Sequence, residues 1–343
     1  MTNTKQYFKA YLRQNFKFIT IVLALVIIVS FIWGINDQPS TYRDFDANVV
    51  YEYYRSTLAI PMYVLFVFSV VFPVKEFSFF KKRINLDCAY SLPISRKAMG
   101  VVHYLVGGVM LWGVYTASYL TNFILMLSRG AGYFNYTPMI EHYFLCLALG
   151  MATYSVFVFV FNEANTRGDG IWFMLLYSLV VYVIIQGLHI AYVLDYEYHI
   201  EVSYSLSSYL LENITSHYEK LVEIAEVRKT SFWDKQDCLW YAYWMVLWAA
   251  SAIGTYLAFG KRRMEKTEEV SDSFFGFRTL IPIYAFSLIL MMGGPGIMDL
   301  VFIEVFAVIG YVIYRRGFHF KKSDFIVLAA ILAYGIFKVY LEK

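Results

Sequence analysis

The fold is decided by an uncharged run near the N-terminus, FITIVLALVIIVSFIWGI at residues 18–35, which Lys17 and Asp37 bracket. A helix must present about 20 mostly apolar residues to cross the ~30 Å hydrocarbon core of a bilayer. This run is long enough, and no small-residue cleavage site follows its last turn. It therefore predicts an uncleaved membrane-spanning helix rather than a signal peptide.

The composition of the whole chain points the same way. Of its 343 residues, 59% are apolar and 16% are charged, whereas an average soluble domain has about 45–50% and about 25%. These fractions exclude a soluble globular enzyme, a disordered chain and a nucleic-acid binder. Three cysteines, Cys88, Cys146 and Cys238, are too few and too scattered for a disulfide framework or a zinc site.

Eight further apolar stretches follow the first one. The sequence thus predicts an all-α integral membrane protein with about nine transmembrane helices. Eight helices are the alternative, because the stretch at 280–292 is short and Lys338 lies inside the last stretch. The predicted spans after the first are residues 57–74, 100–127, 143–161, 170–191, 239–259, 280–292, 297–314 and 326–341.

Basic residues orient the chain, because cytoplasmic loops carry an excess of Lys and Arg. With the N-terminus placed in the cytoplasm, twenty of the 29 Lys and Arg residues fall on the inside. The reversed topology would place the basic clusters outside, against this bias. We therefore expect a cytoplasmic N-terminus.

The predicted spans and loops divide the chain into four parts. Residues 1–17 form an amphipathic interfacial helix, with Tyr and Phe on one side and Lys and Arg on the other, which either anchors the chain or pushes on the first span. Residues 18–194 hold spans one to five, with a long cytoplasmic connection at 75–99. Residues 195–237 form an extracellular helical insertion, and residues 238–343 hold spans six to nine.

The cytoplasmic connection at residues 75–99 is richer than a simple loop requires. Phe77, Phe79 and Phe80 stand among charges, and an apolar patch follows that Pro93 ends. A short helix that docks into a groove of a soluble partner needs aromatic side chains for burial and charges for orientation. The alternative is an interfacial helix that lies on lipid.

Part of this connection carries a family resemblance. Lys82-Arg83, Asp87 and the run SLPISR at 91–96 resemble the coupling segment of ABC-2 type exporter permeases, the membrane subunits of bacterial ATP-driven exporters. The run FGKRRMEK at 259–266 resembles the signature after the sixth span in large firmicute permeases of this kind. We call residues 75–99 the coupling segment. By this resemblance, the residues that would contact the ATPase are Glu76, Phe77, Phe79, Phe80, Lys81, Lys82, Arg83, Asp87, Ser91, Leu92, Pro93 and Arg96.

The resemblance also implies partners and location. Two ABC ATPase subunits, which bind ATP and Mg, would attach to a permease paired with a second copy or a paralogue in the bacterial cell membrane. The chain has no phosphate-binding loop, so we expect neither enzymatic activity nor a cofactor of its own. The resemblance further implies a second cytoplasmic contact through Asn162, Glu163, Arg167 and Asp169; a plain turn is the alternative.

Acidic residues mark the remaining candidate sites. The insertion at 195–237 carries nine acids and four bases, and it forms either a structural lid or a gate that attracts cationic cargo through Glu219, Glu223 and Glu226. Asp299 and Glu304 lie in the eighth predicted span, where a charge costs ~2.5–3.5 kcal/mol on insertion scales. Asp299 is near the outer end, whereas Glu304 either pairs with a buried group or lines an ion path.

Taken with the resemblance, the sequence predicts a permease subunit of an ATP-driven exporter. It would move an amphipathic substrate, a peptide or a lipid-like molecule, out of the cell by alternating access. It would contact the lipid bilayer, and we expect it to bind no nucleic acid. Two alternatives stay open. One is a membrane transporter that works without an ATPase, and the other is a sensor or immunity protein that binds a peptide through its extracellular insertion.

Overall fold

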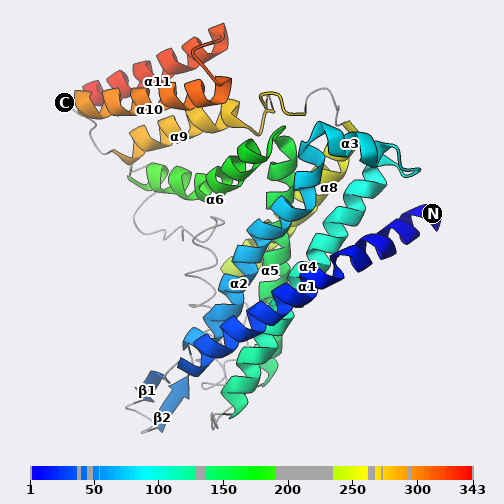
Figure 1. Ribbon diagram of the computed structural model, residues 1–343. Coiled ribbons are helices and arrows are strands. Elements are labelled where there is room, and N and C mark those ends of the chain that lie inside the picture. The colour runs from blue at the N-terminus through cyan, green and yellow to red at the C-terminus, as the bar shows by residue number, and fades with distance from the viewer. Residues whose placement is uncertain are drawn as a thin grey trace. The chain divides into compact units, whose positions relative to one another are not determined.

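The computed structural model describes residues 2–36, 40–44, 49–53, 55–128, 136–190, 235–261, 267–271, 273–292 and 296–341. In these ranges the chain is helical apart from one antiparallel hairpin, β1 (Ser40–Asp44) and β2 (Val49–Tyr53), in which Tyr42 lies opposite Tyr51 (Figure 1). The hairpin joins the first two helices, and the sequence did not predict it.

The helices follow the predicted apolar stretches in order. The long ones are α1 (Thr2–Asn36), α2 (Arg55–Phe77), α4 (Arg96–Ser128), α5 (Tyr136–Glu163), α6 (Arg167–Ile190), α8 (Lys235–Lys261), α9 (Phe277–Met291), α10 (Ile297–Arg315) and α11 (Lys322–Leu341). Seven of them, α1, α2, α4, α5, α8, α10 and α11, are long and apolar enough over their described residues to cross a membrane. The chain is therefore a helical, multi-pass membrane protein, and the count of nine spans stays a prediction.

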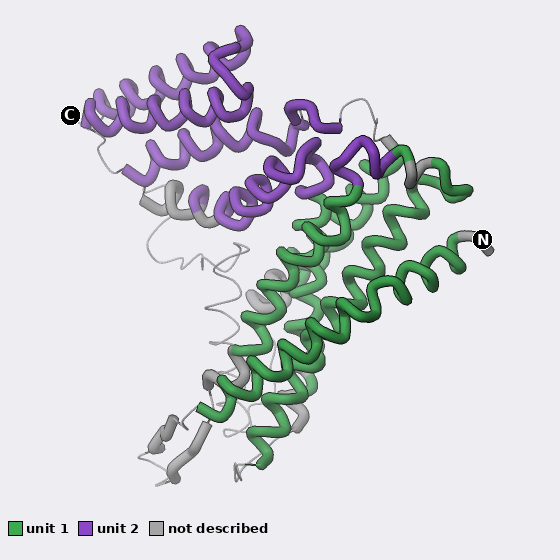
Figure 2. Tube along the Cα trace, viewed as in Figure 1, with its two compact units in different colours: residues 1–79, 87–159, 210–262 green, residues 80–86, 160–209, 263–343 purple. Residues whose placement is uncertain are grey.

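Two compact units make up the chain (Figure 2). Among the described residues, unit 1 holds α1, the hairpin, α2, α4, α8 and α5 up to residue 159. Unit 2 holds the end of α5 from residue 160, α6, α9, α10 and α11. It also takes in residues 80–86, a piece of the coupling segment.

In unit 1, α4 is the central helix and packs against α1, α2 and α8. Ser30 of α1 and Ser118 of α4 are both fully buried, and their hydroxyl oxygens lie 2.8 Å apart. The Tyr154 hydroxyl of α5 donates to the carbonyl oxygen of Tyr104 in α4, at 3.0 Å. Buried polar groups that bond across helices in this way fix how the helices are rotated against each other.

The outer side of α1 is apolar and faces away from the other helices of unit 1. Ile21, Leu25, Ile28 and Ile32 recur at helical spacing, and each keeps more than half of its surface exposed. A continuous exposed stripe of aliphatic side chains marks a surface that contacts lipid or another protein. The stripe therefore agrees with the first predicted span.

In unit 2, α9 packs against α6 and α10, and α11 packs against α10. The Tyr284 hydroxyl of α9 donates to the Leu176 carbonyl of α6 at 2.5 Å. At the turn between α10 and α11, the Arg315 guanidinium donates two hydrogen bonds of 2.9 Å to the Asp324 carboxylate. This two-point ion pair fixes the angle at which the last helix begins.

Lys338, which made the last predicted span uncertain, has a structural role. Its ammonium donates to the carbonyls of Ile289 (3.0 Å), Leu290 (3.2 Å) and Met292 (2.8 Å) at the end of α9. The last carbonyls of a helix have no partner within it, and a cation there also complements the helix dipole. The charge inside α11 is thus balanced by the C-terminal end of the short helix α9.

The N-terminal prediction needs a correction. Residues 1–17 were expected as a separate interfacial helix, but residues 2–36 form the single helix α1 without a break. No Pro or Gly lies between residues 2 and 33 to interrupt it, so the amphipathic stretch continues directly into the apolar one.

Candidate coupling surface

The coupling segment folds into two short helices between α2 and α4. The 3₁₀ helix η1 (Ser78–Lys81) follows α2 directly, and α3 (Arg83–Tyr90) follows η1. After a turn, α4 begins at Arg96, where the Ser95 hydroxyl accepts a hydrogen bond of 3.2 Å from the Ala98 backbone N–H. Pro93 precedes this cap by two residues. Pro93 and Ser95 therefore explain where the turn ends and α4 begins.

The segment has an inner and an outer side. Phe77, Phe80 and Leu86 are completely buried. In contrast, Ile84 is 79% exposed and Phe79 is 39% exposed. Ile84 was not among the predicted contact residues. Besides Phe79, the predicted contact residues on the exposed side are Lys82, Arg83, Asp87, Ser91, Leu92, Pro93 and Arg96.

Four predicted contact residues are therefore placed differently from what we expected. Glu76, Phe77, Phe80 and Lys81 were assigned to a partner, but all four are buried within this chain. Side chains three residues apart lie on the same side of a 3₁₀ turn, so Phe77 and Phe80 point inward together and Phe79 points outward. The outward set is what remains for a partner.

Lys81 is buried to 2% exposure, and it is held by the end of α5 in unit 2. Its ammonium donates to the carbonyls of Phe161 (2.7 Å) and Asn162 (3.3 Å) and to that of Ala164. It also lies 5.0 Å from the centre of the Phe161 ring. The three ammonium hydrogens thus meet the last carbonyls of a helix, a site that favours a cation.

Arg83 ties the same region to the loop before α9. Its Nε donates to the Thr267 carbonyl at 3.0 Å, and its guanidinium lies 3.9 Å from the carboxylates of Glu268 and Glu269. Glu268 has a positive φ of 71°, which marks a tight bend in this loop. The Arg316 guanidinium donates to the Glu268 carbonyl at 3.3 Å, so the turn after α10 also meets the loop.

The predicted second contact lies on the turn between α5 and α6. The Glu163 carboxylate accepts a hydrogen bond of 2.5 Å from the Ser273 hydroxyl, and its backbone carbonyl accepts one of 3.1 Å from Ser271. Asn162 is buried, whereas Arg167 is exposed. Asp169 lies 3.9 Å from Arg316. Within unit 2 the turn therefore contacts the loop before α9 and the turn after α10.

These contacts define what we call the unit 2 hub: residues 81–86, the α5–α6 turn at 162–169, the loop at 267–273 and Arg316. The sequence pointed to the first two parts. It gave no signal for the loop at 267–273, because part of its contacts come from the backbone carbonyls of Thr267 and Glu268, which any residue type supplies, and the rest from Ser and Glu side chains that are common in exposed loops.

The intramembrane acids separate into two cases. The Asp299 carboxylate accepts a hydrogen bond of 2.9 Å from the Gly296 N–H and so caps the start of α10. Glu304 is partly buried, and its Oε2 atom makes no hydrogen bond within the described residues. The predicted gate residues Glu219, Glu223 and Glu226 lie outside the described residues.

No group of His, Cys, Asp and Glu in the described ranges is arranged to hold a metal ion. No protein-family model matches the chain, and no curated protein and no solved structure is significantly similar to it. The function has to be argued from the arrangement of its own residues.

Proposed function

We propose that this chain is the membrane permease subunit of an ATP-driven exporter of the bacterial cell membrane. It moves an amphipathic substrate, a peptide or a lipid-like molecule, out of the cell, while separate subunits hydrolyse ATP. The observation that carries the proposal is the two-sided coupling segment. Its inner side chains are locked into this chain, and its outer side presents Ile84 between the exposed cations Lys82 and Arg83 and the exposed Asp87.

Such a surface suits a soluble partner better than it suits lipid. An apolar side chain that is 79% exposed among charges of both signs gives a docking helix both a buried anchor and a fixed orientation. A helix that lay on the membrane would carry several apolar residues along one side, but Ile84 and Leu86 of α3 point to opposite environments.

The contacts of the unit 2 hub could transmit a movement of the coupling segment to α5 and to the loop before α9. If an ATPase shifts η1 and α3, the Lys81 ammonium pulls on the last carbonyls of α5, and Arg83 pulls on the loop before α9. The turn between α5 and α6 would then follow. The spans would change which side of the membrane is open, in a two-state cycle driven by partner binding.

The proposed assembly holds two ATPase subunits, this chain and a second copy or paralogue, with the cargo path between the two permeases. An aromatic content of 20% suits a cargo with an apolar face better than it suits a sugar. The nine-span topology and the cytoplasmic N-terminus belong to the same proposal.

Co-purification tests the proposal most directly. A tagged chain extracted in mild detergent is expected to retain an ABC ATPase, and Ile84→Asp is expected to release it by placing a charge at the buried anchor. The matched control is Phe318→Asp, the same kind of change at a side chain that is 81% exposed and lies in the turn after α10. Absence of any ATPase from the wild-type preparation, or equal retention by both variants, would contradict the proposal.

One observation favours an ion-driven transporter as the second candidate. Glu76, Lys75 and His103 bring charged and titratable side chains together within unit 1. The sequence alone had shown only one deep acid, Glu304, which lies in unit 2. Ionisable groups inside membrane helices often mark ion or proton paths. Transport by the purified chain in vesicles without ATPase and ATP, abolished by Glu76→Gln, would favour this candidate over the first.

A further inference from the structure

The N-terminal turns of α1 carry a face that the proposed function does not use. Lys5, Lys9, Arg13 and Lys17 recur every four residues, and all four are exposed. At about 100° per residue, they fall within about 120° around the helix axis. Phe16 lies in the same sector, not on the side of Tyr7 and Tyr11 where the sequence predicted it, and it is 66% exposed. We call these five residues the basic face.

The opposite side of the same turns is held by hydrogen bonds. Tyr7, Tyr11 and Asn15 also recur every four residues, two positions out of phase with the lysines and therefore about 200° away. Their partners follow in order along unit 1. Tyr7 Oη lies 3.1 Å from His103 Nε2, Tyr11 Oη donates to Glu76 Oε2 at 2.8 Å, and Lys75 Nζ donates to Asn15 Oδ1 at 2.8 Å. We call these three contacts the polar ladder.

The three side chains that the ladder residues of α1 contact, Lys75, Glu76 and His103, also contact one another. Glu76 and His103 are 0% and 2% exposed, and His103 Nδ1 lies 3.4 Å from Glu76 Oε2. Lys75 Nζ lies 2.6 Å from Glu76 Oε1. Buried polar groups that bond to one another keep their geometry, because breaking one contact leaves a desolvated group behind. The ladder therefore fixes the rotation of α1 and keeps the basic face turned outward.

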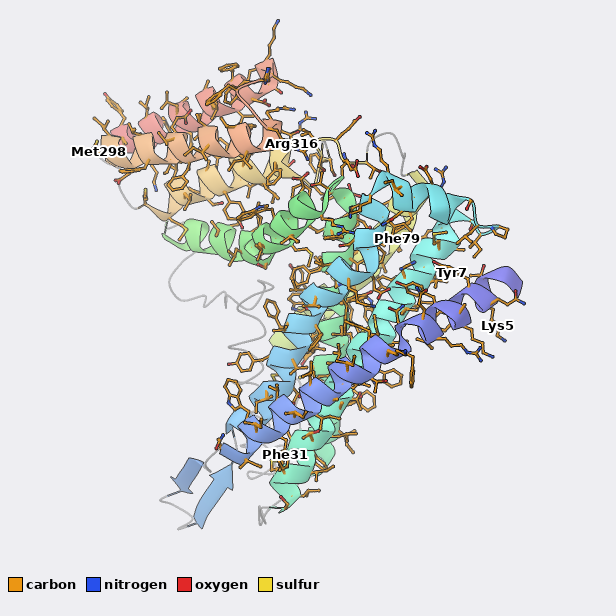
Figure 3. All side chains as sticks on the ribbon, in the orientation of Figure 1. Lys5, Tyr7, Phe31, Phe79, Met298 and Arg316 are labelled. Atoms are coloured by element: carbon orange, nitrogen blue, oxygen red, sulfur yellow. The ribbon has the colours of Figure 1, made fainter. Side chains whose placement is uncertain are left out.

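Figure 3 shows this orientation: the labelled Lys5 and Tyr7 lie on opposite sides of α1. Beyond Lys17 the same helix continues into the exposed apolar stripe that includes Ile21 and Leu25. A stripe that faces lipid, joined without a break to a stripe of cations, places those cations at the membrane surface.

We propose that the basic face of α1 is a binding surface for the headgroups of anionic phospholipids. Four cations on one side attract an anionic leaflet, and Phe16 among them supplies a group that enters the boundary between headgroups and acyl chains. The first acidic residue of the chain is Asp37, so no acid of the helix itself neutralises this face. A soluble protein partner would have to compete for these cations with the lipid surface that the helix enters. This inference does not depend on an ATPase partner.

The test measures how many phosphatidylglycerol molecules the detergent-purified full chain retains, by native mass spectrometry, in competition with phosphatidylcholine. The wild-type chain is expected to prefer phosphatidylglycerol. The combined variant Lys5→Gln, Lys9→Gln, Arg13→Gln, Lys17→Gln is expected to lose affinity for it by about tenfold or more. Because exposed charges are screened by salt, the wild-type preference is expected to shrink as ionic strength rises.

The matched control removes four exposed cations elsewhere, with Lys97→Gln, Arg278→Gln, Lys321→Gln and Lys322→Gln. It is expected to retain phosphatidylglycerol as the wild type does. An equal loss in both variants would show that only total charge matters, and unchanged retention in the first variant would overturn the proposal outright. Release of a protein partner by the first variant, with lipid retention unchanged, would assign the face to that partner instead. Both variants change exposed side chains only, and a single symmetrical peak in size-exclusion chromatography checks that they are folded.

Discussion

The sequence around Lys81 is typical of an exposed charged surface, but the Lys81 side chain is buried and forms hydrogen bonds inside the protein. Lys81 belongs to a run of three cations, Lys81-Lys82-Arg83. Of these three, only Lys81 is buried, with its ammonium against the end of α5. The hydrocarbon stem of a lysine readily crosses apolar surroundings to place its charge at a distance. Lys82 and Arg83 remain exposed, so neighbours of the same type have different roles.

Replacing Lys81 by Met should therefore destabilise the protein. The change keeps the apolar stem but leaves the carbonyls of Phe161, Asn162 and Ala164 without this donor, and we expect a loss of about 1–3 kcal/mol. Thermal unfolding of the purified chain in detergent measures it. Lys82→Met is the control and should change stability little, because Lys82 is exposed. Equal midpoints for the two variants would contradict the role of Lys81.

At the scale of elements, the contact that Tyr154 of α5 makes with α4 depends on a residue without a side chain. A Cβ placed on Gly107 would overlap the Tyr154 hydroxyl oxygen, whereas one placed on Gly113, six residues further along α4, meets nothing within 4 Å. The missing side chain of Gly107 therefore leaves room for the Tyr154 hydroxyl, which reaches the α4 backbone there and bonds to the Tyr104 carbonyl.

Gly107→Ala and Gly113→Ala should accordingly have opposite effects. The first overpacks the contact with Tyr154 and should cost about 1–3 kcal/mol. The second should be neutral or stabilise by about 0.5–1 kcal/mol, because alanine is the better helix former. Unfolding midpoints of the two variants, compared with wild type, decide the matter. A stable Gly107→Ala variant would mean that the Tyr154 hydroxyl lies less close to Gly107 than described.

The elements were largely predictable from the sequence, but their contacts were not. Apolar runs of sufficient length gave the positions of the long helices, because membrane insertion depends on local hydrophobicity. The Lys81 cap and the polar ladder join residues about 80 and about 60 to 100 positions apart, and no local pattern contains that information. The amphipathic N-terminus was recognised, yet its aromatic side proved to face protein through Tyr7 and Tyr11.

For the whole molecule, the distribution of charge predicts the topology. With the proposed orientation, the loop at 267–271 faces the cytoplasm and the insertion at 195–237 faces outward. Cysteine probes test this in a chain in which the three native cysteines are replaced. Ser271 is unsuitable as a probe, because it is 1% exposed and donates a hydrogen bond to the Glu163 carbonyl.

Glu269→Cys and Ser207→Cys are the better pair, since the side chain of Glu269 is 60% exposed. Ser207→Cys should react with a membrane-impermeant thiol reagent in intact cells. Glu269→Cys should react only after the cells are opened, because the excess of Lys and Arg predicts a cytoplasmic location for this loop. Labelling of Glu269→Cys in intact cells would reverse the topology.

The insertion predicted at 195–237 carries nine acids against four bases. Its net charge should raise the local concentration of a cationic amphipathic peptide, and salt should weaken this effect beyond the ~8–10 Å screening length. The competing explanation is that acids accumulate there only because Lys and Arg are kept out of translocated loops. Changing Glu219, Glu223 and Glu226 to Gln distinguishes the two. If the acids form a gate, the variant should protect cells less against a cationic peptide, handle a neutral amphipathic peptide as before, and lose the salt dependence of the wild type. If the variant protects cells as well as the wild type does at both low and high salt, the gate is contradicted. The acids would then be explained by the exclusion of Lys and Arg from translocated loops alone.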